Sequence, residues 1–190
     1  MSKLLLQSAL MLIVLSLVTG VFYPLLVTGI AHLCCARAAE GSLVFRGDRL
    51  VGSRLLGQPF ELPRYFWSRP SATTPAPYNG LASGGSNLGP TNSAQLDAVQ
   101  AQVKRLHEAD PGNASPIPVD LVTASGSGLD PEISPAAAEY QVARVARERG
   151  LDPAVVHSLV ASHTDLRQWG ILGEPRVNVL ELNLALDALR

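Results

Sequence analysis

Cysteine is scarce in this chain of 190 residues: the two copies, Cys34 and Cys35, are neighbours, and none follows them. The rest of the sequence therefore has no disulfide framework and no thiolate metal site. Histidine is also rare, with four copies and no Glu-x-x-His spacing. His157 and His163 are six residues apart, which does not place them on one helix face. The sequence predicts no metal site.

An excess of basic residues is missing as well. The chain has 15 Lys and Arg against 16 Asp and Glu, a formal net charge of −1. Because nucleic-acid-binding domains normally present a basic face, the composition gives no reason to expect a nucleic-acid partner. The aromatic and arginine residues over 64–69 favour packing inside the domain over stacking on bases.

Charge is absent altogether between Lys3 and Arg37, where most residues are Leu, Val, Ile, Ala and Phe. A helix of about 20 apolar residues is long enough to cross the hydrocarbon layer of a bilayer. We therefore predict a membrane anchor with one transmembrane helix over residues 1–36 and a soluble domain over residues 37–190. Representative anchor residues are Leu12, Val18, Tyr23 and Pro24.

A cleaved signal peptide is the alternative to a retained anchor. Ala36-Arg37-Ala38 fits the pattern of a cleavage site, but the apolar run is about twice the normal 7–15 residues of a signal, so we favour a retained anchor. Pro24 removes one helical hydrogen bond and predicts a kink. Small and hydroxyl side chains near Pro24 favour packing against another membrane helix.

The side of the membrane is not determined by charge. Only Lys3 precedes the apolar run, whereas four arginines follow it closely: Arg37, Arg46, Arg49 and Arg54. The positive-inside rule alone would place the domain in the cytoplasm, but long domains translocate largely regardless of charge.

The soluble part reads as a compact α+β domain with short strands and about four helices. A hairpin is predicted from 43–45 and 50–51, and a strand from 119–123. Helices are predicted from Ser93 to about Asp110, from Pro135 to Arg149 with Ser134 as cap, from Pro153 to Ser162 with Asp152 as cap, and from Asn178 onward.

Two loops rich in small residues, 83–92 and 123–130, are the densest unusual stretches. The first could cradle an anion with its amides, but no Gly-Lys-Ser/Thr follows, so it is not a Walker loop. The second offers Ser125 and Ser127 as nucleophiles, but without the Gly-x-Ser-x-Gly elbow. A triad of Ser127, a histidine and Asp130 can be assembled from the sequence, but with four scattered histidines such a set arises by chance. A membrane-anchored or secreted serine hydrolase and a stand-alone nucleotide-binding module remain alternatives.

Motifs along most of the chain resemble one family. They are Tyr23-Pro24, Leu56-Gly57-Gln58, Tyr65-Phe66, Arg69-Pro70-Ser71, Tyr78-Asn79, the runs 83–92 and 118–131, Tyr140-Gln141, Arg144-Val145-Ala146, and the run 173–180 followed by Leu182-Asn183. As a set they resemble KdpC, the small single-pass subunit of the bacterial high-affinity potassium-transporting P-type ATPase complex. One departure is Glu132, where relatives often carry His.

The resemblance implies an accessory, non-catalytic subunit in the bacterial inner membrane. Its expected partners are a potassium-binding, channel-like subunit and an ATP-hydrolysing P-type subunit, whose ATP affinity it would raise as a catalytic chaperone. The positions to which nucleotide contact would be carried over are Ser83, Gly84, Gly85 and Gln141. The loop positions expected to meet a partner or to shape the domain are Tyr65, Arg69, Asn87 and Asn92.

The same resemblance implies that the soluble domain lies on the outer face of the membrane. A domain there cannot touch ATP held in the cytoplasm, so an effect on ATP affinity would have to pass through the other subunits as a coupling free energy. No tightly bound cofactor is expected; ATP would be met only in a ternary complex with the catalytic subunit.

Overall fold

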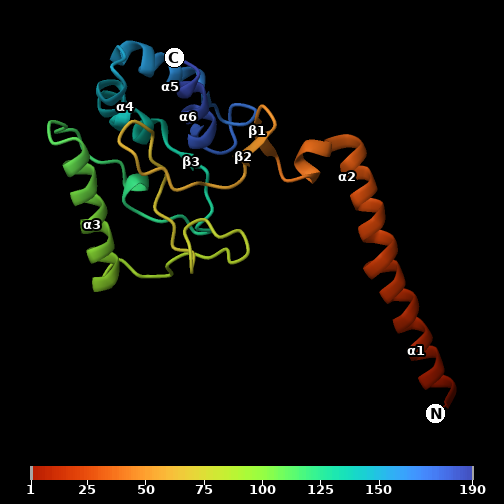
Figure 1. The fold of residues 1–190 in the computed structure, drawn as a ribbon. Coiled ribbons are helices and arrows are strands. Elements are labelled where there is room, and N and C mark those ends of the chain that lie inside the picture. The colour runs from red at the N-terminus through yellow and green to blue at the C-terminus, as the bar shows by residue number, and fades with distance from the viewer. Residues whose placement is uncertain (1, 190) are drawn as a thin grey trace. The chain divides into compact units, whose positions relative to one another are not determined.

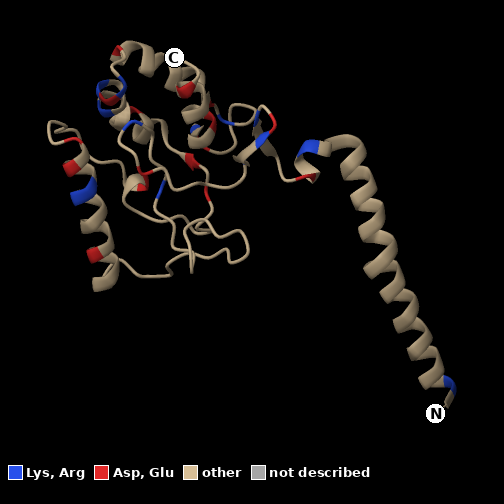
Figure 2. Ribbon diagram, in the orientation of Figure 1, with Lys and Arg blue, Asp and Glu red and all other residues tan. Residues whose placement is uncertain are grey.

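The computed structural model describes residues 2–189 and divides the chain into two compact units, Met1–Val51 and Gly52–Arg190. The first unit contains one long helix built from α1 (Ser2–Leu17), a π turn η1 (Val18–Phe22) and α2 (Tyr23–Ala39). This helix of 38 residues is long and apolar enough to cross a membrane, and no residue of its most apolar stretch is buried. Figure 2 shows charged residues of this helix only near its two ends.

Pro24 does not break the helix where the sequence predicts a kink. Tyr23 donates its amide hydrogen to the carbonyl of Val18, and Phe22 and Tyr23 keep helical angles. The wider π turn accommodates the missing proline amide. The departure from helical geometry lies instead at Cys35, with φ −143° and ψ 45°. The helix is thus irregular at the predicted place, where the π turn precedes Pro24, and it leaves helical geometry where the apolar run ends.

A two-stranded hairpin follows the helix, as predicted. Its strands are β1 (Leu43–Arg46) and β2 (Arg49–Ser53), and Gly47 has a φ of 61° at the turn. The predicted anchor boundary after residue 36 falls three residues before the end of α2. Most of the hairpin belongs to the same compact unit as the helix, which ends at Val51.

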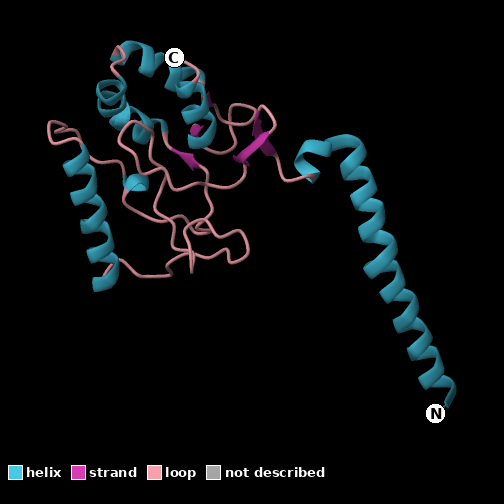
Figure 3. Cartoon of the chain, in the orientation of Figure 1, coloured by secondary structure: helices cyan, strands magenta, loops and turns pink. Residues whose placement is uncertain are grey.

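The second unit is an α+β domain (Figures 1 and 3). In chain order it contains α3 (Ser93–Ala109), a 3-10 turn η2 (Val119–Leu121), β3 (Glu132–Ile133), α4 (Pro135–Arg149), α5 (Pro153–Ser162), β4 (Thr164–Asp165), β5 (Arg176–Asn178) and α6 (Val179–Asp187). The strands form an antiparallel sheet in the order β3-β5-β4, with Ile133 and Thr164 both opposite Val177.

The predicted helix starts are confirmed by side-chain caps. Each helix of the domain begins after a residue whose side-chain oxygen accepts a hydrogen bond from the first turn, which satisfies one of the free amides there. The four caps are Asn92, Ser134, Asp152 and Asn178. Gly150 ends α4 in the left-handed region, with φ 65°, as the sequence predicts.

The predicted strand over 119–123 is wrong. Val119–Leu121 forms a 3-10 turn in which the amides of Leu121 and Val122 bond the carbonyls of Pro118 and Val119. These local bonds replace a strand ladder. Asp120, in the middle of the turn, accepts hydrogen bonds from the amide and the hydroxyl of Ser134, so the turn holds the start of α4.

The core of the domain lies between α4, α5, α6 and the sheet. Its most buried members include Val145, Val156, Val177 and Leu182, all fully or almost fully shielded from solvent. Phe66 joins this core although it belongs to a long segment without helices or strands (Figure 3). This segment has to find partners for its backbone outside a sheet or a helix.

Candidate functional site

The extended segment Phe66–Trp67 is held by two side-chain amides. The amide hydrogen of Phe66 bonds Asn183 Oδ1 at 2.9 Å, and Asn183 Nδ2 donates to the Phe66 carbonyl at 3.0 Å. The amide hydrogen of Trp67 bonds Gln141 Oε1 at 2.8 Å, and Gln141 Nε2 donates to the Trp67 carbonyl at 3.2 Å. Asn183 on α6 and Gln141 on α4, here called the amide pair, therefore bond this segment as a neighbouring strand would.

Arg144 completes this arrangement from α4. Its guanidinium, in a residue only 2% exposed, donates to the carbonyls of Pro63 and Tyr65 and, at 2.6 Å, to Gln141 Oε1. It also lies 4.3 Å from the centre of the Trp67 ring. Burial lowers the pKa of Arg144 to about 10, so the group remains protonated at neutral pH and its charge is shared among these acceptors.

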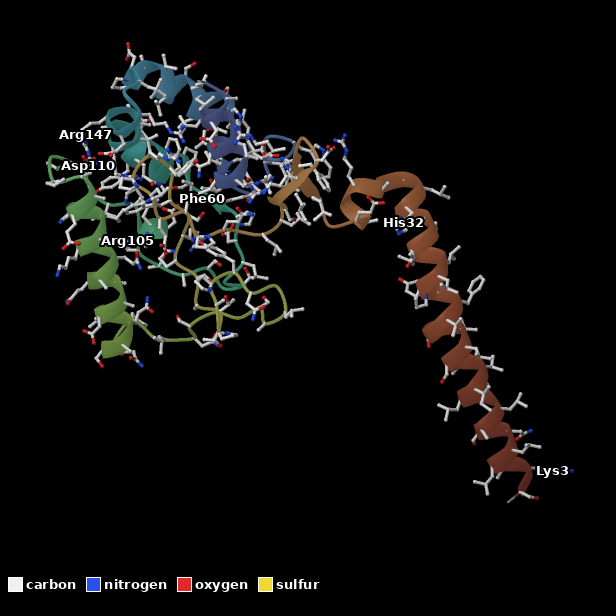
Figure 4. The ribbon with its side chains drawn as sticks, in the orientation of Figure 1. Lys3, His32, Phe60, Arg105, Asp110 and Arg147 are labelled. Carbon is white, nitrogen blue, oxygen red and sulfur yellow. The ribbon has the colours of Figure 1, made fainter. Side chains whose placement is uncertain are left out.

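Helix α3 is attached to the same region by two charged residues (Figure 4). Arg105 lies 4.4 Å from the centre of the Trp67 ring, so this ring has two guanidinium neighbours. Asp110, which ends α3 and is 4% exposed, accepts a hydrogen bond from Arg147 of α4 at 2.7 Å. The carboxylate raises the pKa of Arg147 through this hydrogen bond. These contacts connect α3 to α4.

Gln141, a predicted nucleotide contact, lies inside the domain. The residue is 1% exposed, and its Nε2 donates to the Ala137 carbonyl as well as to Trp67. With Arg144 and the Trp67 amide on its oxygen, the whole side-chain amide is engaged. A direct contact of Gln141 with ATP stays a prediction, and such a contact would require these bonds to open.

The predicted glycine–serine loop packs on the second small-residue loop. The amide of Gly84 bonds the Ser127 carbonyl at 2.9 Å, and the Ser83 hydroxyl bonds the same carbonyl at 3.1 Å. A side chain at Gly85 would meet the Gly126 carbonyl at 3.0 Å. Ser83, Gly84 and Gly85 are therefore brought together with residues 126–128, while none of the hydrogen bonds of residues 2–189 joins them to Gln141.

Gly128 is needed for this close packing. It has a φ of 67°, and a Cβ atom there would lie 2.6 Å from Thr73 Cγ2 and 2.7 Å from the Gly84 carbonyl oxygen. Its own carbonyl accepts a hydrogen bond from the Ser71 hydroxyl at 2.7 Å. Three segments, over 71–73, 83–85 and 125–128, thus meet at one glycine.

The four residues predicted to meet a partner or to shape the domain divide into two pairs. Tyr65 and Arg69 are built into the domain: the Tyr65 hydroxyl bonds Asp187 at 3.2 Å, and Arg69 forms an ion pair with Asp130 at 3.1 Å. Asn87 and Asn92 are exposed. Asn87 has a φ of 52°, a conformation that asparagine tolerates better than most residues, and Asn92 caps α3.

A cleft of about 180 Å³ lies beside Arg69, and part of its wall is formed by Trp67, Tyr78 and Arg105. The Tyr78 hydroxyl donates to the Arg69 carbonyl, and burial raises the pKa of Tyr78. Tyr78 therefore stays protonated as a donor at neutral pH. The cleft is narrow compared with the several hundred Å³ of typical small-molecule sites.

The proposed nucleophiles are part of the loop packing. Ser125 Oγ accepts from the Gly128 amide at 3.0 Å, and Ser127 Oγ accepts from the Leu129 amide at 3.1 Å. His163 bonds Leu159 and Ser162 on its own helix. Among residues 2–189 no hydrogen bond joins a histidine to either serine, and no group of three metal-ligating side chains is found. The geometry lends the hydrolase hypothesis no support.

Asn183 and Arg144 were not assigned a role from the sequence. A signal exists for both, because each is a polar residue on the apolar face of a helix: Asn183 stands among Val179, Leu182 and Leu186, and Arg144 beside Val145. The sequence does not show which backbone groups they bind. Glu132, the position that departs from the family pattern, forms an ion pair with Arg176 at 2.9 Å across β3 and β5.

The long apolar helix and the internally bonded loops define a chain with one helix long and apolar enough to cross a membrane, followed by an α+β domain. The family model described as "K+-transporting ATPase, c chain" matches residues 5–188. The chain belongs to this family, which is called KdpC.

Individual relatives cover nearly the whole chain. A protein of Methylococcus capsulatus named "Potassium-transporting ATPase KdpC subunit" is 64% identical over 181 residues, 95% of each chain. A protein of the same name from Variovorax paradoxus is 64% identical over 92% of this chain and 90% of its own. A third, from Dechloromonas aromatica, is 57% identical over 100% of this chain and 99% of its own.

We predict that Gln141→Ala lowers the free energy of unfolding by about 3 kcal/mol or more, because it leaves several buried groups of Trp67 and Arg144 without partners. Urea unfolding of the full chain in detergent, followed by circular dichroism, measures this. Gln100→Ala removes an exposed glutamine of α3 and is the matched control. Equal stability of the two variants would mean that the hydrogen bonds of Gln141 are dispensable for folding.

Gly128→Ala is expected to lower the free energy of unfolding by more than about 1 kcal/mol, because alanine is strained at positive φ and its Cβ would clash with Thr73 and Gly84. Gly126→Ala, whose Cβ meets nothing within 4 Å, should change it by less than about 0.5 kcal/mol. Thermal melts of both variants measure these two changes. A larger loss of stability in Gly126→Ala than in Gly128→Ala would contradict the loop packing described above.

Proposed function

We propose that this chain is an accessory, non-catalytic subunit of a potassium-transporting ATPase, held in the bacterial inner membrane by its N-terminal helix. The observation that carries this proposal is the family match, which spans the helix as well as the domain, from residue 5 to residue 188. Its partners would be a potassium-binding, channel-like subunit and the ATP-hydrolysing subunit of the same complex. The printed names of the relatives, as subunits of a potassium-transporting ATPase, support an assembly of this kind.

The anchor supplies a surface for assembly. Its helix carries Thr19, Gly20, Thr28 and Gly29 around the π turn, and small and hydroxyl side chains let a second membrane helix approach closely. Nothing within 4 Å would meet a Cβ at Gly20 or Gly29. We propose that helices of the partner subunits pack against this part of the anchor.

The chain would raise the ATP affinity of the catalytic subunit as a catalytic chaperone. We place its domain on the outer face of the membrane, so the effect would reach the cytoplasmic ATP site through the other subunits. A coupling of about 1–3 kcal/mol would change ATP affinity about 5- to 150-fold. The engagement of the Gln141 amide inside the core supports coupling over direct contact. Contact through Ser83, Gly84 and Gly85 in a ternary complex is the competing model.

Removal of residues 4–33 is predicted to abolish assembly while leaving the domain folded, because the core of the domain lies entirely after Gly52. Co-purification with a tagged catalytic subunit measures assembly, and growth at low potassium measures function. The control replaces residues 4–33 with an unrelated apolar helix of equal length, which keeps the membrane attachment but not the packing surface. A truncated chain that still co-purifies and restores growth would contradict the proposal.

A further inference from the structure

The loop between β4 and β5 carries an exposed apolar tip. Its side chains Leu166, Trp169, Ile171 and Leu172 are 75%, 88%, 74% and 48% exposed. Within one short loop this is a dense group of large apolar side chains, and such exposure marks a contact surface for a membrane or another protein. The four residues are here called the apolar tip.

The backbone of this loop is ordered by its own hydrogen bonds. Gln168 and Leu172 exchange two bonds, of 2.8 and 2.9 Å, and the amides of Gly170 and Ile171 bond the carbonyls of Arg167 and Gln168. Four of the five amides from Gln168 to Leu172 are therefore satisfied within the loop. Trp169 and Gly170 accept positive φ values of 53° and 78° to close it.

The charged residues at the base of the loop neutralise each other. Arg167 and Glu174 form an ion pair at 2.6 Å, so the charge of each is compensated beside the apolar tip. An environment poor in water penalises every unsatisfied backbone group, and four amides at the end of this loop are already bonded within it. Trp is moreover enriched at membrane–water interfaces, where its ring sits among the headgroups.

The length of the connecting chain allows the loop to reach the lipid around the anchor. From Ala39 at the end of α2 to Leu43 the chain spans at most about 14 Å, and paired strands of the hairpin lie about 5 Å apart. Asn178, at the end of β5, donates its side-chain amide to the carbonyl of Arg54, just after the hairpin. From Asn178 back to Leu172 the chain spans at most about 20 Å.

We propose that the apolar tip inserts into the headgroup region of the bilayer that holds the anchor, as a second membrane contact of the domain. The ligand is the lipid interface itself, recognised by apolar burial and the indole of Trp169. Because the anchor already confines the domain to the membrane, a contact of low intrinsic affinity is sufficient. The insertion would hold the domain in one orientation over the bilayer.

The test is the fluorescence of the full chain in phosphatidylcholine vesicles, with and without lipids brominated on their acyl chains. The chain has two tryptophans, Trp67 and Trp169, and neither lies in the helix that spans the membrane. Trp67 is 6% exposed in the domain core. We expect brominated lipid to quench the emission of the wild type, and Trp169→Phe to lose most of that quenching.

A second variant of the apolar tip and a control variant at another loop make the result interpretable. Ile171→Ser should reduce the quenching, whereas Leu81→Ser, at a fully exposed leucine of another loop, should not. In Trp169→Phe the emission comes from Trp67 alone, and an emission maximum typical of a buried indole shows that the domain remains folded. The proposal is overturned if Trp169 is as accessible to acrylamide in vesicles as in detergent and unaffected by brominated lipid. It is also overturned if Trp169 becomes shielded only when the partner subunits are present, which would make the apolar tip a protein-docking surface.

Discussion

The backbone of Phe66 and Trp67 has to be hydrogen-bonded in a place where no strand accompanies it, and the rest of the domain depends on how this is achieved. Buried amides and carbonyls without partners cost free energy comparable to lost hydrogen bonds. The amide pair, Gln141 and Asn183, supplies these partners from two helices, α4 and α6. Both helices are thereby fixed to one extended segment, and Arg144 donates three further hydrogen bonds at the same junction.

In this arrangement several polar motifs of the described residues are engaged in hydrogen bonds inside the domain. Gln141, Arg144 and Asn183 are used inside the fold, and the serines of the second small-residue loop bond neighbouring amides. Gly128 lets three loop segments approach one another closely, so the loops form a fixed surface. A domain of this kind suits an accessory subunit that acts through contacts with larger subunits, which is the role we propose.

The sequence predicts those features that local chemistry determines. Asn92, Ser134 and Asp152 cap helices where the sequence places the helix starts, and Gly150 ends α4. Contacts between distant residues could not be predicted, because Trp67 lies 74 positions from Gln141 and Phe66 lies 117 from Asn183. The strand expected over 119–123 failed for a different reason: its apolar residues fit a strand, but local hydrogen bonds close a 3-10 turn there instead.

The most direct measurement is equilibrium binding of a labelled ATP analogue to the full chain alone and to the complete complex with and without it. If the Gln141 amide is an internal partner of Trp67 and the chain acts by coupling, the chain alone will not bind the analogue. The complex will then lose about 5- to 150-fold in affinity when the chain is removed. Saturable binding to the chain alone, lost on replacement of Ser83 and Gly84, would contradict this.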